Sequence, residues 1–218
     1  MRAVVITDTS NRSVSIEEVA DPVPGDDQIV VDVKACGINF TDLLSLDGKY
    51  QNNPPPPFTP GKDAAGIVAA VGANVTGHKV GDRVIAHVIH GAMAEKAVCP
   101  AALAFPLPDG VEFDSAAAMG LAYLTGYIAL TRRGAMQPGE VVMINGASGG
   151  VGLASVSLAK ALGASVVLAG LTTPSKGDAV KAAGADAIID LTVDDLKDNL
   201  RAQVTEATGG RGIDLAFD

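Results

Sequence analysis

A short glycine-rich segment between an apolar run and a helix-like stretch has the residue types that bind phosphate groups. Ala147, Gly149 and Gly152 follow the apolar run 141–145 with the spacing of the G/A-x-G-x-x-G motif. Gly149 would let the backbone approach a pyrophosphate, and Gly152 would let the helix pack closely on the strand. The free N–H groups and positive dipole of a helix N-terminus also favour phosphates. We therefore predict a dinucleotide site formed by Ala147, Ser148, Gly149, Gly150, Val151 and Gly152. The alternative is a glycine-rich turn that binds no ligand.

The segment after the next apolar run indicates which nicotinamide coenzyme this site would take. An NAD enzyme usually carries Asp or Glu about 20 residues after the loop, where the acid binds the ribose 2′-hydroxyl. The corresponding stretch, 169–173, has no acid, and Lys176 follows it closely. A cation with neighbouring hydroxyl groups suits a 2′-phosphate, so we expect NADPH, bound by Gly170, Thr172, Ser175 and Lys176. The alternative for Lys176 is a solvated lysine at a helix start.

The periodicity of the sequence predicts the elements that position these residues. Five runs rich in Val and Ile, bounded by Gly, Asp and Pro, predict strands at 1–7, 13–19, 28–38, 63–72 and 81–89. A short helix is expected over 39–46, and Asp114 is expected to cap the N-terminus of a helix over the apolar run 115–130. Further on, strands at 141–145, 165–170, 187–190 and 213–217 alternate with helices ending at Leu162, over 174–183 and over 194–207. This alternation predicts a parallel sheet with right-handed crossovers.

Composition and charge exclude several classes of function. Of 218 residues, 48% are hydrophobic and 19% charged, which favours a folded core over disorder. The net charge of -9 and an aromatic content of 4% without Trp speak against binding of nucleic acid. The sequence has only two cysteines, no secretory signal at its start and no apolar run near the ~18 residues of a membrane span. We therefore expect a cytoplasmic protein with neither a membrane nor a nucleic acid as its partner.

Several blocks along the whole chain resemble one family. GINFTDLLSLDGKY at 37–50, TPGKDAAGIVAAVG at 59–72 and QPGEVVMINGASGGVG at 137–152 resemble the zinc-independent quinone oxidoreductases of the medium-chain dehydrogenase/reductase superfamily. The resemblance implies a GroES-like, β-rich catalytic domain over 1–125, followed by the N-terminal part of a Rossmann domain over 126–218, whose sheet is parallel and doubly wound. It places the active site in the cleft between these domains. It also implies NADPH-dependent hydride transfer to a quinone or another α,β-unsaturated carbonyl compound.

The resemblance further assigns candidate catalytic residues. Asn39 and the Tyr50 hydroxyl would donate hydrogen bonds to the substrate oxygen, where negative charge develops, and Asp42 would orient the site. Thr125 would contact the nicotinamide carboxamide. Each of these residues could instead have a purely structural role. Asn39 and Asp42 would then cap their short helix. Tyr50 would pack in a loop, and Thr125 would be an interior residue of its helix. Leu44 stands where the family has another tyrosine.

Both zinc sites of the zinc-dependent relatives are predicted to be absent. Asn39 stands where those relatives have a Cys ligand, Lys62 and Asp63 stand where they have His and Glu, and Cys99 is alone in the region of the structural zinc lobe. We therefore expect no metal. Without a Lewis acid nothing lowers the pKa of an alcohol, so reduction of a conjugated carbonyl is favoured over alcohol oxidation. Leu191 replaces a tyrosine that helps to bind the 2′-phosphate in some members.

Two other functions stay open at this point. One is an enoyl thioester reductase, and the other is a non-catalytic nucleotide-binding protein of the crystallin type. The expected partner is a small quinone or enone, with a homodimer for the full-length protein. The chain ends at its fourth expected Rossmann strand, whereas the doubly wound order runs 3-2-1-4-5-6. We therefore expect the sequence to be part of a longer protein.

Overall fold

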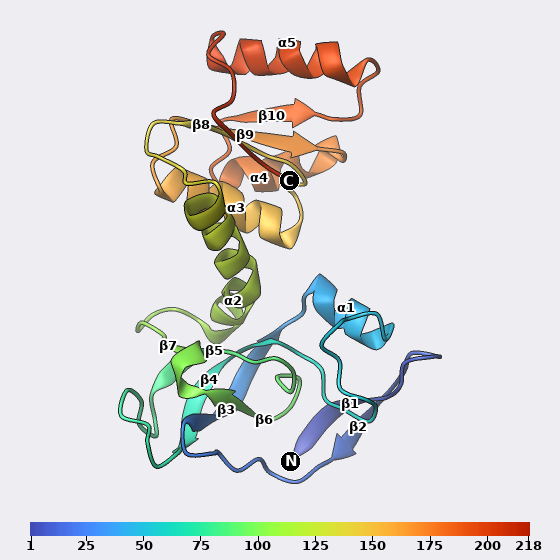
Figure 1. The fold of residues 1–218 in the computed structure, drawn as a ribbon, viewed down its shortest axis with the longest axis vertical. Helices are drawn as coiled ribbons and strands as arrows, with labels where there is room; N and C mark the ends of the chain where they lie inside the picture. The colour runs from blue at the N-terminus through green and yellow to red at the C-terminus, as the bar shows by residue number, and fades with distance from the viewer. The chain divides into compact units, whose positions relative to one another are not determined.

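The computed structural model describes residues 1–218, which divide into two compact units, Met1–Leu121 and Ala122–Asp218. Figure 1 labels the elements of each unit. Each unit has hydrophobic clusters of its own. The domain boundary expected from the sequence, between residues 125 and 126, lies four residues after this division and in the same helix, α2 (Phe113–Tyr127).

The first unit is built from antiparallel strands. Its five-stranded sheet has the order β6-β3-β4-β5-β7, with the strands β3 (Gln28–Gly37), β4 (Asp63–Val71), β5 (Arg83–His87), β6 (Lys96–Pro100) and β7 (Ala104–Pro106). The strands β1 (Arg2–Asp8) and β2 (Ser13–Glu18) pair separately. The strands β1 to β5 confirm the prediction from the Val and Ile runs. The pattern does not predict β6 and β7, which are short and end in proline, and both lie at the edges of the sheet where proline is tolerated.

The helix α1 (Phe40–Leu46) follows the end of β3 directly, as the sequence predicts. The prediction that Asp114 caps the next helix is wrong, because α2 begins one residue earlier, at Phe113. Phe113 packs against the apolar cluster around Leu107 and Ala116, and the Arg83 guanidinium lies 4.6 Å from its ring centroid. The helix thus starts two residues before the expected Ser115, so Asp114 lies within its first turn. No helix of either unit combines the length and apolar character that a membrane crossing requires.

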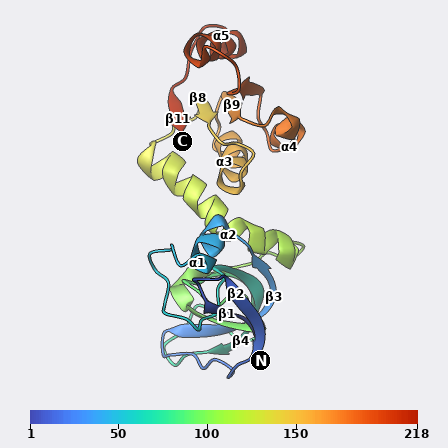
Figure 2. The ribbon, with the colours of Figure 1, turned by 90° about the vertical axis from the view of Figure 1, so that its right-hand side faces the viewer.

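The second unit contains a four-stranded parallel sheet in the order β10-β9-β8-β11. Its strands are β8 (Val141–Ile144), β9 (Val166–Leu171), β10 (Ala187–Asp190) and β11 (Leu215–Phe217). Counted from β8, the order is 3-2-1-4, which matches the first four strands of the doubly wound fold. In Figure 2, α3 (Gly150–Ala161) and α4 (Gly177–Ala182) lie on one side of this sheet and α5 (Leu196–Thr208) on the other. This confirms the expected β-rich part followed by part of a Rossmann-type sheet.

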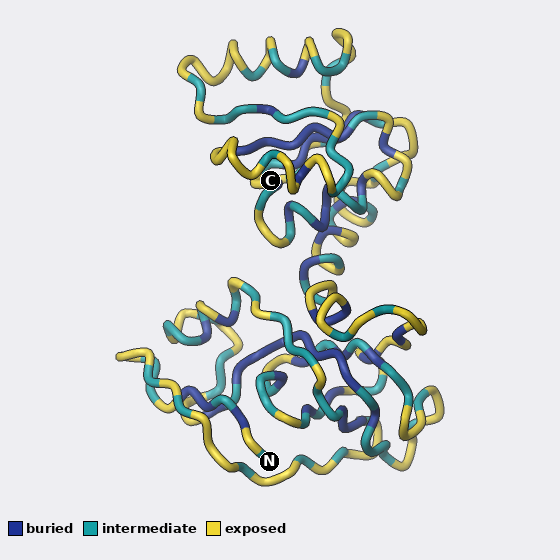
Figure 3. Tube along the Cα trace, turned by 180° about the vertical axis from the view of Figure 1, so that it is seen from behind, coloured by how far each residue is buried: buried dark blue, intermediate teal, exposed yellow.

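Helices on both faces explain why the strands of the second unit are continuous apolar runs. Val142 and Ile144 of β8 belong to the cluster that contains Val156 of α3. Val141 and Met143, which point the opposite way along the same strand, belong to the cluster that contains Val204 of α5. Figure 3 shows the resulting continuous buried stretches in β8 and β9. A parallel sheet covered in this way has no polar face, so its strands show no alternation in the sequence.

Candidate functional site

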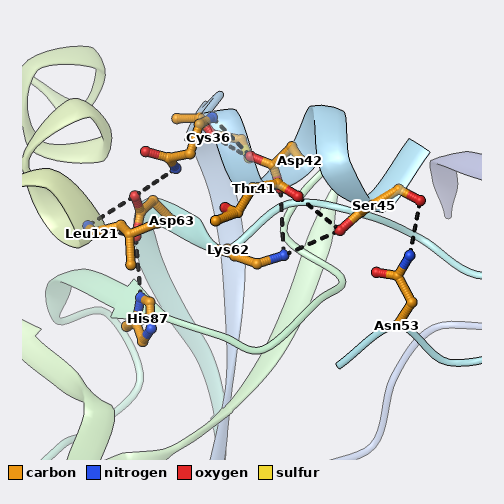
Figure 4. Close-up of polar contacts among 11 residues, drawn as sticks. Cys36, Thr41, Asp42, Ser45, Asn53, Lys62, Asp63, His87 and Leu121 are labelled. Atoms are coloured by element: carbon orange, nitrogen blue, oxygen red, sulfur yellow. Dashed lines mark hydrogen bonds and ion pairs between the residues drawn. The ribbon is translucent and has the colours of Figure 1, made fainter. Parts of the chain in front are cut away.

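A buried carboxylate connects three elements of the first unit. Asp63, the first residue of β4, is only 1% exposed. Its Oδ2 accepts a hydrogen bond of 2.9 Å from Nδ2 of Asn39, and both of its oxygens accept the backbone N–H of Leu121, at 3.0 and 2.9 Å. Its Oδ1 lies 3.2 Å from Nδ1 of His87 (Figure 4). The carboxylate therefore ties together the start of α1, the end of β5 and the helix α2.

The bond to Asp63 fixes the amide of Asn39. A carboxylate only accepts hydrogen bonds, so the atom that faces it must be the amide nitrogen, and the amide oxygen must point the other way. One N–H of this group is used by Asp63, and the second N–H can be donated to another acceptor. Asn39 is thus an oriented hydrogen-bond donor, which is what the proposed role at a substrate oxygen requires.

Asp42 lies next to Asn39 and makes two different contacts. Its Oδ2 accepts the backbone N–H of Asn39 at 2.8 Å, which is one half of a capping box at the start of α1. Its Oδ1 lies 3.7 Å from Nζ of Lys62, and the two residues are 5% and 4% exposed. The capping role considered as an alternative from the sequence is therefore present, and it is combined with a buried ion pair.

Lys62 brings Tyr50 into the same group of residues. Its Nζ lies 4.2 Å from the centroid of the Tyr50 ring and 3.5 Å from Oγ of Ser45. The structure thus gathers Asn39, Asp42 and Tyr50, the three candidate catalytic residues, around Lys62 and Asp63. From the sequence, Lys62 and Asp63 are identified only as residues that stand in place of zinc ligands. The signal that could have identified them is a pair of charges at the start of an otherwise apolar strand.

In the second unit the predicted phosphate loop joins β8 to α3. Gly146 has a φ of +58°, and its carbonyl accepts the N–H of Gly149 at 2.9 Å. A Cβ at Gly152 would lie 2.2 Å from the Gly146 oxygen and 2.8 Å from Cα of Ala147, so only glycine fits there. A Cβ at Gly150 would meet nothing within 4 Å. The close packing expected for the third small residue of the motif is therefore present at Gly152.

The start of α3 leaves backbone donors free. Gly149 precedes the helix in an extended conformation, and its carbonyl accepts the first intrahelical bond, from Leu153, at 2.8 Å. The N–H groups of Gly150, Val151 and Gly152 come before that bond, so they have no partner within the helix. Ser148 is half-buried in the same loop. Free N–H groups at a helix N-terminus can bind an anion, so the phosphate-binding role of these residues stays a prediction.

The residues predicted to select NADPH gather at the carboxyl end of β9. Gly170 accepts the N–H of Ala147 at 3.3 Å, so this strand end lies directly against the phosphate loop. Thr172, Ser175 and Lys176 follow it on an exposed segment that includes the 3₁₀ turn Pro174–Lys176. The Lys176 side chain forms no ion pair within the chain, so its charge is free for a ligand.

Thr125 lies on α2 within the second unit, and its side chain is exposed. The next residue, Gly126, packs so closely on α3 that a Cβ there would lie 2.6 Å from Oγ of Ser155. The helix that carries Thr125 is thereby placed against the helix that begins at the phosphate loop. Asn145, which the sequence analysis did not single out, follows β8 and donates from Nδ2 to Asp218 at 3.1 Å, while its Oδ1 is buried without a hydrogen-bond partner.

Comparison with protein families gives two matches along the chain. Residues 25–109 match the model described as alcohol dehydrogenase GroES-like domain. Residues 150–218 match the model described as zinc-binding dehydrogenase. The two matches fall in the β-rich unit and in the unit with the parallel sheet, respectively.

Curated relatives and solved structures resemble the whole chain. Quinone oxidoreductase-like protein 2 homolog of Nematostella vectensis is 37% identical over 219 residues, covering 100% of this chain and 58% of the relative. Synaptic vesicle membrane protein VAT-1 homolog of Homo sapiens is 36% identical over 199 residues, covering 91% of this chain and 49% of the relative. The structure of Escherichia coli quinone oxidoreductase complexed with NADPH matches with a TM-score of 0.82 and 33% identity, covering 98% of this chain and 64% of that one. The chain thus spans about half to three fifths of the length of these curated relatives.

The thiol of Cys36, whose pKa is affected by burial and by the charges of Asp42 and Asp63, is expected to be unreactive. Cys36 lies at the end of β3, and burial, followed by the charges of Asp42 and Asp63, raises the pKa of its thiol to about 12. Burial alone raises the pKa of Cys99 to about 11. Because the thiolate is the reactive form, iodoacetamide at about pH 8 should label both residues slowly in the folded protein and rapidly in urea.

The same shifts have a consequence for stability. The folded protein holds the two thiol protons more tightly than the unfolded chain, in which they are lost near the ordinary pKa of 9.0. The free energy of unfolding should therefore decline as the pH rises from about 9 towards the folded values. Labelling of Cys36 in buffer as fast as in urea, followed by mass spectrometry, would contradict both expectations.

Proposed function

The chain belongs to the quinone oxidoreductase family of the medium-chain dehydrogenase/reductase superfamily, and from this we propose that it uses NADPH to reduce a quinone or another α,β-unsaturated carbonyl compound without zinc. The observation that carries the proposal is the amide of Asn39, which Asp63 holds as a donor with one N–H to spare. Such a donor suits an oxygen that gains negative charge during the reaction. The two units would have different roles: the second would bind the coenzyme, and the first would donate hydrogen bonds to the substrate.

The second unit would hold NADPH. The free N–H groups at the start of α3 would bind the pyrophosphate, and the close contact at Gly152 keeps the loop backbone near enough for this. Lys176, with the hydroxyl groups of Thr172 and Ser175, would bind the 2′-phosphate, and Thr125 would hold the nicotinamide carboxamide. When bound, NADPH supplies the hydride. The solved relative in complex with NADPH supports this choice of coenzyme.

The first unit would stabilise the product charge. As the hydride reaches an electron-poor carbon, negative charge moves to the substrate oxygen, and the free N–H of Asn39 would donate to it. The Tyr50 hydroxyl would serve as a second donor and as the source of a proton. Asp42 would act indirectly, because its Oδ2 holds the backbone of Asn39 at the helix start. Because these donors are fixed before the reaction, no reorganisation is needed while it proceeds.

The residues at this place do not fit a zinc ion. The ammonium of Lys62 has no lone pair to offer while it is paired with Asp42. Both oxygens of Asp63 already accept hydrogen bonds, and the nitrogen of the Asn39 amide faces one of them. No thiolate or pair of imidazoles completes a tetrahedral set. Carbonyl reduction, which needs only hydrogen-bond donors, is therefore better supported than alcohol oxidation.

Steady-state oxidation of NADPH tests this function directly. We expect 1,4-quinones or enones to accelerate NADPH consumption by the protein, and Asn39→Ala to lower kcat by about 10²–10³-fold, as loss of one oxyanion donor does elsewhere. Asn11→Ala, in an exposed turn, is the matched control. Preference for enoyl thioesters would favour the alternative enzyme. NADPH binding without reduction of any acceptor would favour a non-catalytic protein.

The coenzyme preference depends on one lysine. Lys176→Ala should weaken NADPH binding by about tenfold, since a hydrogen bond to a charged group contributes about 1.5 kcal/mol or more, and should leave NADH binding unchanged. Nicotinamide fluorescence titration measures both. Lys181→Ala, an exposed lysine on the neighbouring α4, controls for a general loss of positive charge. If Lys176→Ala binds NADPH as well as the unaltered protein does, the 2′-phosphate assignment is wrong.

A further inference from the structure

Lys62 is a buried cation among the candidate donors of the first unit. Its side chain is only 5% exposed, so it does not reach solvent as most lysines do. Figure 4 shows its Nζ pointing to the helix α1, where Asp42 and Ser45 lie on its inner side. Because Nζ is covered, Lys62 does not itself touch a substrate. Any effect it has on a reaction must pass through its neighbours.

The first neighbour is Asp42, whose charge depends on Lys62. One oxygen of Asp42 accepts the Asn39 N–H, and the other has no hydrogen bond at all within the chain. The Lys62 ammonium, 3.7 Å away, is the cation that faces this second oxygen. A buried carboxylate left without its partner is strongly destabilising. The cap at the start of α1, and with it the backbone of Asn39, therefore depends on the charge of Lys62.

The second neighbour is Tyr50. Its backbone N–H donates to the carbonyl of Leu44 at 3.2 Å, which ties the chain at this point to α1. Its ring lies over Nζ of Lys62 at 4.2 Å, within the range of a cation–π contact, which is stronger where water is excluded. The same ammonium thus holds the helix start that carries Asn39 and the ring that carries the Tyr50 hydroxyl.

We propose that Lys62 is a positioning residue, whose buried ammonium fixes Asn39, through Asp42, and the Tyr50 ring relative to each other. This inference rests on the proposed function, because the two groups it positions are the proposed donors. It assigns to Lys62 an electrostatic role in the first unit that needs no contact with substrate or coenzyme. It also gives a function to a lysine that is almost completely buried.

The comparison of Lys62→Met with Lys62→Met/Asp42→Asn separates positioning from folding. Lys62→Met leaves Asp42 unpaired, so it should lower both stability and kcat. In the double variant both charges of the Lys62–Asp42 pair are removed together, and the oxygen of the introduced amide can still accept the Asn39 N–H, so stability should recover. We expect kcat to stay about 10- to 100-fold below that of the unaltered protein, because the ring has lost its cation. Recovery of kcat together with stability would show a purely structural role and overturn the proposal.

A second measurement does not depend on turnover. The chain has three tyrosines and no tryptophan, so the ring signals of Tyr50 can be assigned by NMR with Tyr50→Phe. They should shift in the double variant. They should not shift in the control Lys79→Met, which removes the charge of an exposed lysine in the loop before β5. Unchanged Tyr50 signals in the double variant would overturn the proposal. Absence of any acceptor reduction by the unaltered protein would instead overturn the proposed function and leave this measurement to decide the role of Lys62.

Discussion

Charged groups that leave water must be paired or hydrogen-bonded, and the first unit obeys this constraint within a single small region. Asp63 is the clearest case, because its carboxylate is almost completely buried and has donors from three elements. Those elements must approach closely. A Cβ at Gly120 would lie 2.4 Å from the Asp63 oxygen, and one at Gly37 would lie 2.4 Å from the Ala117 carbonyl. Glycine at these two places lets α2 pack against β3 and β4. This close packing brings the Leu121 N–H within hydrogen-bond distance of the Asp63 carboxylate.

In the second unit the limiting constraint is steric. The phosphate loop folds back so far that Gly152 contacts the backbone of Gly146, and Gly126 allows α2 to pack on α3. The contact at Gly152 places backbone, and not a side chain, at the start of α3. A helix N-terminus that is free of side chains can bind phosphates through its N–H groups. Under the proposed function, the first unit would provide oriented donors and the second would bind the phosphates of the coenzyme.

Local patterns in the sequence predict much of this, and the limits are physical. The glycine-rich loop between β8 and α3 could be predicted because its motif, strand and helix are adjacent in the chain. The link between Asn39 and Asp42 could be considered because the two residues are three apart at a helix start. The contacts of Asp63 with Asn39 and His87 span 24 residues each and depend on the register of the sheet, in which Asp63 pairs with Gly37 on one side and with His87 on the other. Neither register can be obtained from composition or periodicity.

The Asp63 carboxylate holds the Asn39 amide, β5 and α2 together, and urea unfolding of Asp63→Asn measures how much it contributes. An amide presents an N–H₂ group to donors that previously met an oxygen, so we expect the free energy of unfolding to fall by about 1–3 kcal/mol. Asp109→Asn, at a fully exposed aspartate, should change it by no more than about 0.5 kcal/mol. If Asp63→Asn unfolds at the same urea concentration and with the same slope as the unaltered protein, the carboxylate does not hold these elements together.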